Sequence, residues 1–101
     1  MKYIITESVL EKIINRYFNE IFEDSTLGSE DIGSGGEWFG VFNRNGEIII
    51  GHPSHDDYNY FYNGTTFFNA HELFGISLEE FRRYLKIYVE NRFNITINDL
   101  M

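Results

Sequence analysis

The three histidines of the chain lie within one stretch, and two of them stand close to aspartates. Imidazole and carboxylate groups are the ligands that zinc, manganese and non-haem iron take in proteins. If the chain folds back after this stretch, a metal ion would be held by His52, His55, His71 and one of the two aspartates, Asp56 or Asp57. No His-Glu-x-x-His sequence or other zinc spacing is present, and Asp and Pro are ordinary loop residues. A loop without metal is therefore the favoured interpretation, and a small metal-dependent hydrolase is the minor alternative.

Other catalytic patterns are missing from the sequence. No serine stands in a Gly-x-Ser-x-Gly turn. Asp56 and Asp57 are direct neighbours, and neighbouring side chains diverge in an extended segment, so they make a poor acid–base pair. The glycines at 33–36 precede a predicted strand with no Lys directly after them, unlike a phosphate-binding loop. The sequence thus predicts no catalytic residue and no cofactor, and it favours a binding protein over an enzyme.

Three tyrosines, Tyr58, Tyr60 and Tyr62, alternate along one predicted strand. Alternate residues share a face of a strand, so Phe61 lies on the opposite face. If the Phe61 face meets the helices, the tyrosine face is open. Tyrosine suits recognition surfaces because it offers a large area at small entropic cost, and its ring can stack on a nucleobase. The alternative is that these tyrosines cover the second side of a small two-sided core.

Three cations, Arg82, Arg83 and Lys86, cluster on the last predicted helix beside an outward-pointing Ile87. Arginine and lysine at this spacing can hold a phosphate group. Glu79 stands at helical spacing from Arg83, so an internal ion pair is the alternative. The sequence therefore predicts a ligand or partner site made of these three cations and the three tyrosines.

The composition narrows the possible partners. The 101 residues include 16 acidic and 8 basic side chains, a net charge of −8. A negative field repels nucleic acids and anionic lipids, so the chain is expected to bind neither. The absence of cysteine excludes disulfides and cysteine nucleophiles and favours the cytoplasm. The N-terminal apolar run is too short for a signal peptide, and no segment reaches the length of a membrane span.

The first element that positions the candidate site residues is a helix predicted over 8–22. Apolar pairs repeat every four residues along it and cover more than half of its circumference. Such a wide stripe predicts either a deep groove or contact with a second copy, so a homo-oligomer through this helix is one expectation. Residues 23–37 are acidic, Gly/Ser-rich and without periodicity, which predicts a loop.

Two hairpins are predicted over 38–68, with turns at Asn45–Gly46 and Asn63–Gly64, because both residue types tolerate positive φ. A short helical turn at 69–74 ends at Gly75, and a helix over 77–93 starts at the capping pair of Ser77 and Glu80. The predicted fold is a single α+β domain over 1–101. A four-stranded antiparallel sheet of two hairpins carries both long helices on one face.

The sequence resembles small uncharacterised accessory proteins of tailed bacteriophages in three places. These are the opening at 1–8 with the amphipathic helix that follows it, residues 45–53 and residues 74–77. The resemblance covers about a third of the chain, and its motifs are structural. It implies a phage gene acting in the cytoplasm of a bacterial host or in a virion, and it carries no catalytic residue over to this sequence.

Together these observations predict a small acidic binding protein of the counter-defence type. It would block a host protein or sequester a small anionic molecule. The alternative is a self-associating structural or assembly component of a phage that uses the helix at 8–22.

Overall fold

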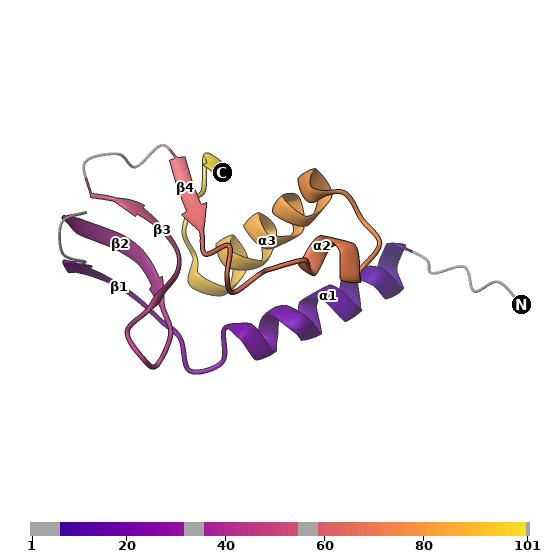
Figure 1. Cartoon of the computed structure of the whole chain (residues 1–101), viewed down its shortest axis with the longest axis horizontal. Helices are drawn as coiled ribbons and strands as arrows, with labels where there is room; N and C mark the ends of the chain where they lie inside the picture. Colours follow the sequence, from indigo (N-terminus) through magenta and orange to yellow (C-terminus); the bar gives the residue numbers. More distant parts are fainter. Residues whose placement is uncertain (1–6, 32–35, 55–58, 101) are drawn as a thin grey trace, which may run out of the picture.

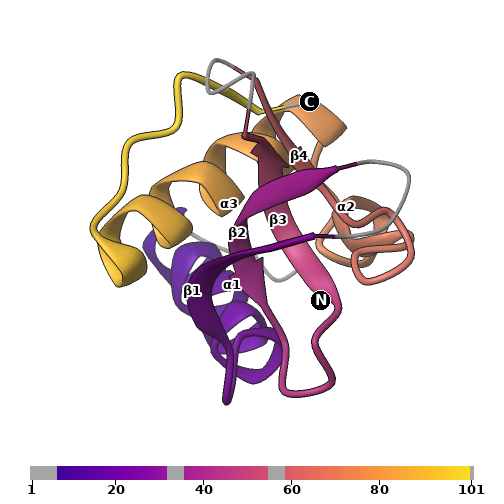
Figure 2. The same ribbon diagram turned by 90° about the vertical axis from the view of Figure 1, so that its left-hand side faces the viewer.

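The computed structural model describes residues 7–31, 36–54 and 59–100, and it is an α+β fold as the sequence predicts. A sheet stands at one end of the molecule and the helices extend from it (Figure 1). Figure 2 looks onto the outer side of the sheet and shows α1 and α3 behind it. The elements follow in the order α1 (Glu7–Ile21), β1 (Thr26–Asp31), β2 (Glu37–Phe42), β3 (Ile48–Pro53), β4 (Asn59–Tyr62), α2 (Ala70–Leu73), α3 (Leu78–Phe93) and β5 (Asp99–Leu100).

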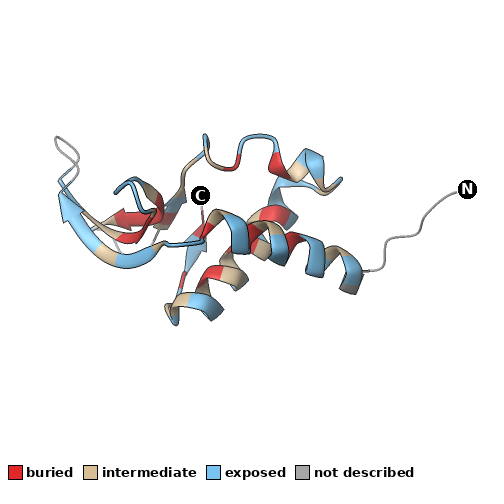
Figure 3. Ribbon diagram, turned by 90° about the horizontal axis from the view of Figure 1, so that it is seen from below, coloured by how far each residue is buried: buried red, intermediate tan, exposed pale blue. Residues whose placement is uncertain are grey.

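Helix α1 divides its wide apolar stripe between core and surface. Ile14, Phe18 and Phe22 are fully buried, at 0% exposure. Val9 and Ile13 lie at the opposite edge of the stripe and remain 46% and 44% exposed. Figure 3 shows buried and exposed residues along the same helix. Part of the apolar stripe of α1 is therefore exposed at the surface.

Helix α3 begins as the sequence predicts. The Ser77 side chain accepts a 3.1 Å hydrogen bond from the Glu80 backbone amide, which satisfies one of the free donors of the first turn. The helix ends at Asn94, which adopts a left-handed conformation with φ 54°. Its core side carries Phe81, Leu85 and Val89. Ile87 points outward and is 47% exposed.

The sheet differs in detail from the predicted one. It has five strands in the order β1-β2-β3-β4-β5, antiparallel except for the parallel pair β4–β5. Parallel neighbours need a crossover connection, which α2 and α3 provide here. Strand β5 has only two residues, too few to show a periodic signal in the sequence.

The prediction of a loop over 23–37 is wrong for β1, which pairs with β2 along all six of its residues. β1 is an edge strand, and only Gly28 among its residues is half-buried while the others are exposed. A strand exposed on both faces has no need of alternating apolar residues, so its sequence has no strand period. Residues 26–31 form a strand only because their backbone pairs with β2.

The second predicted hairpin is also wrong. Gly64 is not among the described glycines with positive φ, which a tight hairpin turn would require. Instead, the Asn63 side-chain oxygen accepts from the Thr65 and Thr66 amides at 2.9 and 3.3 Å. The chain turns there toward α2, and Phe67 enters the core at 5% exposure. The first turn forms where the sequence predicts it, with Gly46 at φ 81°, but Asn45 is not among the described residues with positive φ.

Two glycines allow β2 and β3 to approach closely. Gly40 and Gly51 are paired in register, and Gly28 of β1 continues the row. A Cβ atom on Gly40 would lie 2.6 Å from the Gly51 Cα and would also overlap the Ile50 carbonyl oxygen. No side chain fits at Gly40 without moving the backbone of β3, so glycine is required for this strand crossing.

The core between the helices and the sheet is unusually aromatic. Phe18 lies 5.7 Å from Phe81 and 5.1 Å from Tyr88, measured between ring centroids. Phe67 approaches Phe18 and Phe81 from the segment before α2. These contacts join α1 to α3 and hold the two helices side by side, which sets the surface between them.

Candidate functional site

Helix α3 and the segment around β5 line an open surface hollow of about 460 Å³. It contains the three cations that the sequence singles out, Arg82, Arg83 and Lys86. They gather because residues three and four apart lie on the same side of a helix. The other residues of this basic hollow are Glu79, Asn98, Asp99 and Leu100.

The cations of the basic hollow have no carboxylate partner within the described residues. In that part of the chain the salt bridge that forms joins Arg44 to Asp24, at 3.9 Å, far along the sequence from α3. The alternative of an ion pair between Arg83 and Glu79 is therefore not realised. Glu79 and Asp99 line the same hollow without forming an ion pair with these cations.

Arg82 is held in place by Tyr62. Its Nε donates a 3.4 Å hydrogen bond to the Tyr62 hydroxyl, and its guanidinium carbon lies 5.9 Å from the centre of the Tyr62 ring. A cation over an aromatic face is attracted by the ring quadrupole. Tyr62 therefore belongs to the site as a residue that positions Arg82.

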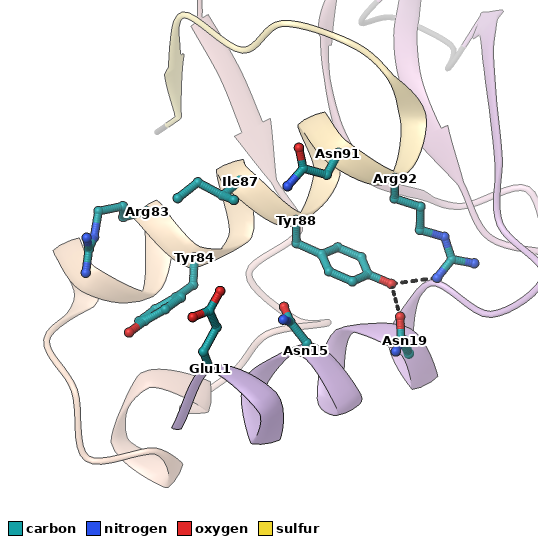
Figure 4. A pocket seen from close by; sticks show the side chains of 9 residues that line it. All are labelled: Glu11, Asn15, Asn19, Arg83, Tyr84, Ile87, Tyr88, Asn91 and Arg92. Atoms are coloured by element: carbon teal, nitrogen blue, oxygen red, sulfur yellow. Dashed lines mark hydrogen bonds between the residues drawn. The ribbon is translucent and has the colours of Figure 1, made fainter. Parts of the chain in front are cut away.

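A second hollow, the α1–α3 groove, runs between the two long helices and measures about 490 Å³ (Figure 4). Side chains four apart on each helix face one another across it. Two tyrosine rings from α3 extend toward α1 and meet a row of polar side chains there. The lining residues are Glu11, Asn15, Asn19, Arg83, Tyr84, Ile87, Tyr88, Asn91 and Arg92.

A hydrogen-bond network closes one end of the groove. The Tyr88 hydroxyl donates to Oδ1 of Asn19 and accepts from Nη1 of Arg92, both at 2.6 Å. Arg92 also donates from Nη2 to the Phe22 carbonyl at 3.0 Å. That carbonyl is just past the C-terminus of α1, where a cation is favoured by the helix dipole. Arg92 is thus engaged in structure, and the network orients the Asn19 carboxamide.

Arg83 lines both hollows. It lies on the outer side of α3, and its guanidinium carbon stands 5.2 Å from the centre of the Tyr84 ring, which belongs to the groove. The basic hollow and the α1–α3 groove are therefore neighbours that share one cation.

The predicted open tyrosine face is wrong where the structure describes it. Tyr60 is 4% exposed and belongs to the core, and Tyr62 packs against Phe67 at 5.9 Å between ring centroids. Phe61 points to the other side and is 41% exposed, next to Trp38. Tyr60 packs in the core cluster with Phe81 and Leu85 of α3, so this side of β4 faces inward. Tyr58 lies outside the described residues.

The described histidines do not come together. His52 is 6% exposed, its Nδ1 lies 2.7 Å from the Pro53 carbonyl oxygen, and its ring meets Tyr60 edge-on at 4.7 Å. His71 Nδ1 lies 3.1 Å from the Ile76 carbonyl oxygen in the turn after α2. The described ranges hold no group of three or more potential metal ligands. His55 and Asp56 lie outside those ranges.

The groove residues on α1 are the part of the site that sequence reasoning missed. Glu11, Asn15 and Asn19 repeat every four residues, a polar row that a helical wheel displays. The row by itself reads as a solvated helix face. What makes it a groove wall is the position of α3 opposite, and no local pattern shows that.

Comparison with known proteins adds no assignment. The chain matches no family model, no curated protein and no solved structure. Among the described residues, no helix has both the length and the apolar character that crossing a membrane requires. The evidence for a function is therefore the residue content of the two hollows on α3.

Proposed function

We propose that this chain is a non-catalytic binding protein that sequesters a small phosphate-bearing molecule in the basic hollow. The observation that carries the proposal is that Arg82, Arg83 and Lys86 line one hollow and have no carboxylate partner in the described chain. Guanidinium groups suit phosphate because they donate two parallel hydrogen bonds to its oxygens. Arg82 is already oriented by Tyr62, which lowers the entropic cost of binding.

The overall charge supports a small ligand over a polymer. A net charge of −8 opposes the approach of a long polyanion, whose phosphates would extend beyond the cations of α3. A small anion contacts only the local cluster, where three cations outnumber the two carboxylates, Glu79 and Asp99. We place this binding in the cytoplasm of a bacterial host, as a phage counter-defence activity, on the resemblance of the N-terminal segment.

The direct test is a nuclear magnetic resonance titration of the isotope-labelled full chain with pyrophosphate at constant ionic strength. Amide shifts are expected to concentrate around Arg82, Arg83 and Lys86. The double variant Arg82→Gln with Lys86→Gln should weaken binding by at least tenfold. Its matched control is Lys12→Gln with Arg16→Gln on α1, which removes the same charge and should bind as the wild type. Equal weakening in both variants, or no localised shifts, would show that the hollow is not the site.

A second candidate function is self-association through α1. Val9 and Ile13 are about half exposed and line a hollow of about 240 Å³ together with Lys12 and Arg16. A second copy could cover this apolar strip. Sedimentation velocity over a wide concentration range would show a dimer that Ile13→Lys abolishes. A wild-type chain that stays monomeric at high concentration would remove this candidate.

A further inference from the structure

We propose that the sequestered molecule is a nucleotide, with its phosphate in the basic hollow and its base in the α1–α3 groove. This inference rests on the proposed function and extends it to the neighbouring hollow. The observation behind it is that Arg83 lines both hollows, so the two are adjacent and a ligand that spans them would contact a shared cation.

The lining of the groove matches the chemistry of a base. Tyr84 and Tyr88 line the groove with aromatic rings. A planar heterocycle would stack on the ring surface that Arg83 leaves on Tyr84 and that the phenylalanines of the core leave on Tyr88. Asn15 and Asn91 each supply a carboxamide, which has an NH₂ donor beside a carbonyl acceptor. The edge of a nucleobase carries a donor and an acceptor at a matching spacing, so the two groups can form a pair of hydrogen bonds. A volume of about 490 Å³ is within the range of small-molecule sites.

The network at Tyr88 prepares the groove for a ligand that accepts hydrogen bonds. The Oδ1 atom of Asn19 already accepts from the Tyr88 hydroxyl, so the group that Asn19 offers to a ligand is its NH₂. Ring nitrogens and exocyclic carbonyls of bases are acceptors of this kind. Because Arg92 holds Tyr88 in turn, this part of the groove is ordered before the ligand arrives.

The charges set the orientation of the ligand. Glu11 lines the groove but not the basic hollow, and its carboxylate repels a phosphate placed beside it. Arg92, the other cation of the groove, is engaged by the Tyr88 hydroxyl and the Phe22 carbonyl. Arg82 and Lys86 line the basic hollow alone, and together with Arg83 they outnumber its two carboxylates, Glu79 and Asp99. In the groove, Glu11 offsets Arg83, the one cation there that makes no hydrogen bond within the described chain. The phosphate is therefore directed to the basic hollow and the base to the groove.

Isothermal titration calorimetry on the full chain tests the inference with defined probes: the four ribonucleoside 5′-monophosphates, their nucleosides and ribose 5-phosphate. At least one monophosphate is expected to bind tenfold or more tightly than both its nucleoside and ribose 5-phosphate. The double variant Asn15→Ala with Asn91→Ala should reduce that affinity to the level of ribose 5-phosphate and leave ribose 5-phosphate binding unchanged. Both side chains are exposed, so the fold should tolerate the changes. Asn45→Ala, an exposed carboxamide outside both hollows, is the matched control and should bind as the wild type.

The possible failures are distinguishable. If the monophosphates bind no more tightly than ribose 5-phosphate, the nucleotide assignment is overturned while phosphate binding stands. If neither ribose 5-phosphate nor any nucleotide binds, the proposed function fails as well. If a single-stranded oligonucleotide binds more tightly than every mononucleotide, the ligand is a polymer and the inference is wrong.

Discussion

The Tyr88 hydroxyl donates a 2.6 Å hydrogen bond to Oδ1 of Asn19, and this bond joins α3 to α1 at one end of the groove between them. The two residues are separated by 69 positions in the chain. The hydroxyl also accepts a hydrogen bond from Arg92, which in turn donates to the Phe22 carbonyl. The Tyr88 oxygen is therefore bonded to Asn19 on α1 and, through Arg92, to the C-terminal end of the same helix. Helix pairing and groove chemistry thus depend on the same side chain.

Replacing Tyr88 by Phe tests that connection. The ring and its packing on Phe18 and Phe22 remain, while both hydrogen bonds of the hydroxyl are lost. We expect the free energy of unfolding to fall by about 0.5–1.5 kcal/mol for a hydrogen bond of this kind, measured by urea denaturation. Tyr84→Phe is the matched control, since the Tyr84 hydroxyl has no hydrogen bond within the described residues. Equal losses in the two variants would contradict the role given to the Tyr88 hydroxyl.

Gly40→Ala should destabilise the sheet. The added Cβ would collide with the backbone of β3, at 2.6 Å from the Gly51 Cα, so the two strands must move apart. We expect a loss of about 1–3 kcal/mol or more, the range for overpacking a tight site. The comparison is Gly28→Ala in the same glycine row, where an added Cβ meets no atom within 4 Å. Thermal unfolding of both variants would show the difference, and a Gly28→Ala loss as large as that of Gly40→Ala would refute the steric explanation.

Phe18→Ala and Phe68→Ala should differ widely in effect. Phe18 is fully buried at the junction of α1, α3 and the segment before α2, whereas Phe68 is 77% exposed. Removal of a buried phenyl ring costs about 3–5 kcal/mol, and exposed substitutions stay within about 0.5 kcal/mol. Urea denaturation measures both. A Phe68→Ala loss comparable to that of Phe18→Ala would mean that Phe68 is covered in solution, as by a second copy of the chain.

Alkaline pH should weaken the fold through Tyr17. Burial raises the pKa of the Tyr17 hydroxyl above its ordinary value, so the folded chain holds this proton more tightly than the unfolded chain does. The resulting stability is fully present below the unfolded pKa of about 10 and is lost as the pH rises through the folded pKa. Urea midpoints between about pH 9 and pH 12 should fall more steeply for the wild type than for Tyr17→Phe. Parallel pH profiles would show that Tyr17 does not contribute.

Features that depend on neighbours in the chain could be read from the sequence. Ser77 caps α3 because its hydroxyl reaches an amide three residues away. Gly46 turns the first hairpin because it tolerates φ 81°. Arg82, Arg83 and Lys86 could be grouped for the same reason, since the pitch of one helix places them together.

Features that depend on pairing between distant segments could not be read in this way. β1 has no apolar alternation because both of its faces are exposed, and β5 is too short to show a period. The same Asn-Gly pair that turns a hairpin at 45–46 leads the chain toward a helix at 63–64. Tyr60 is buried because its side of β4 packs in a core cluster with Phe18 of α1 and Leu85 of α3, residues far from it in the chain.

By itself, the sequence determined the α+β class, the start of α3, the first hairpin turn and the cluster of cations, because each of these is encoded within a few residues. The tertiary structure alone decided which face of β4 is buried and which helix stands opposite α3. Aromatic packing around Phe18 places Asn15 and Asn19 across from Tyr84 and Tyr88. The groove exists because burial of the whole core determines these long-range contacts. A pattern within a few neighbouring residues cannot show them.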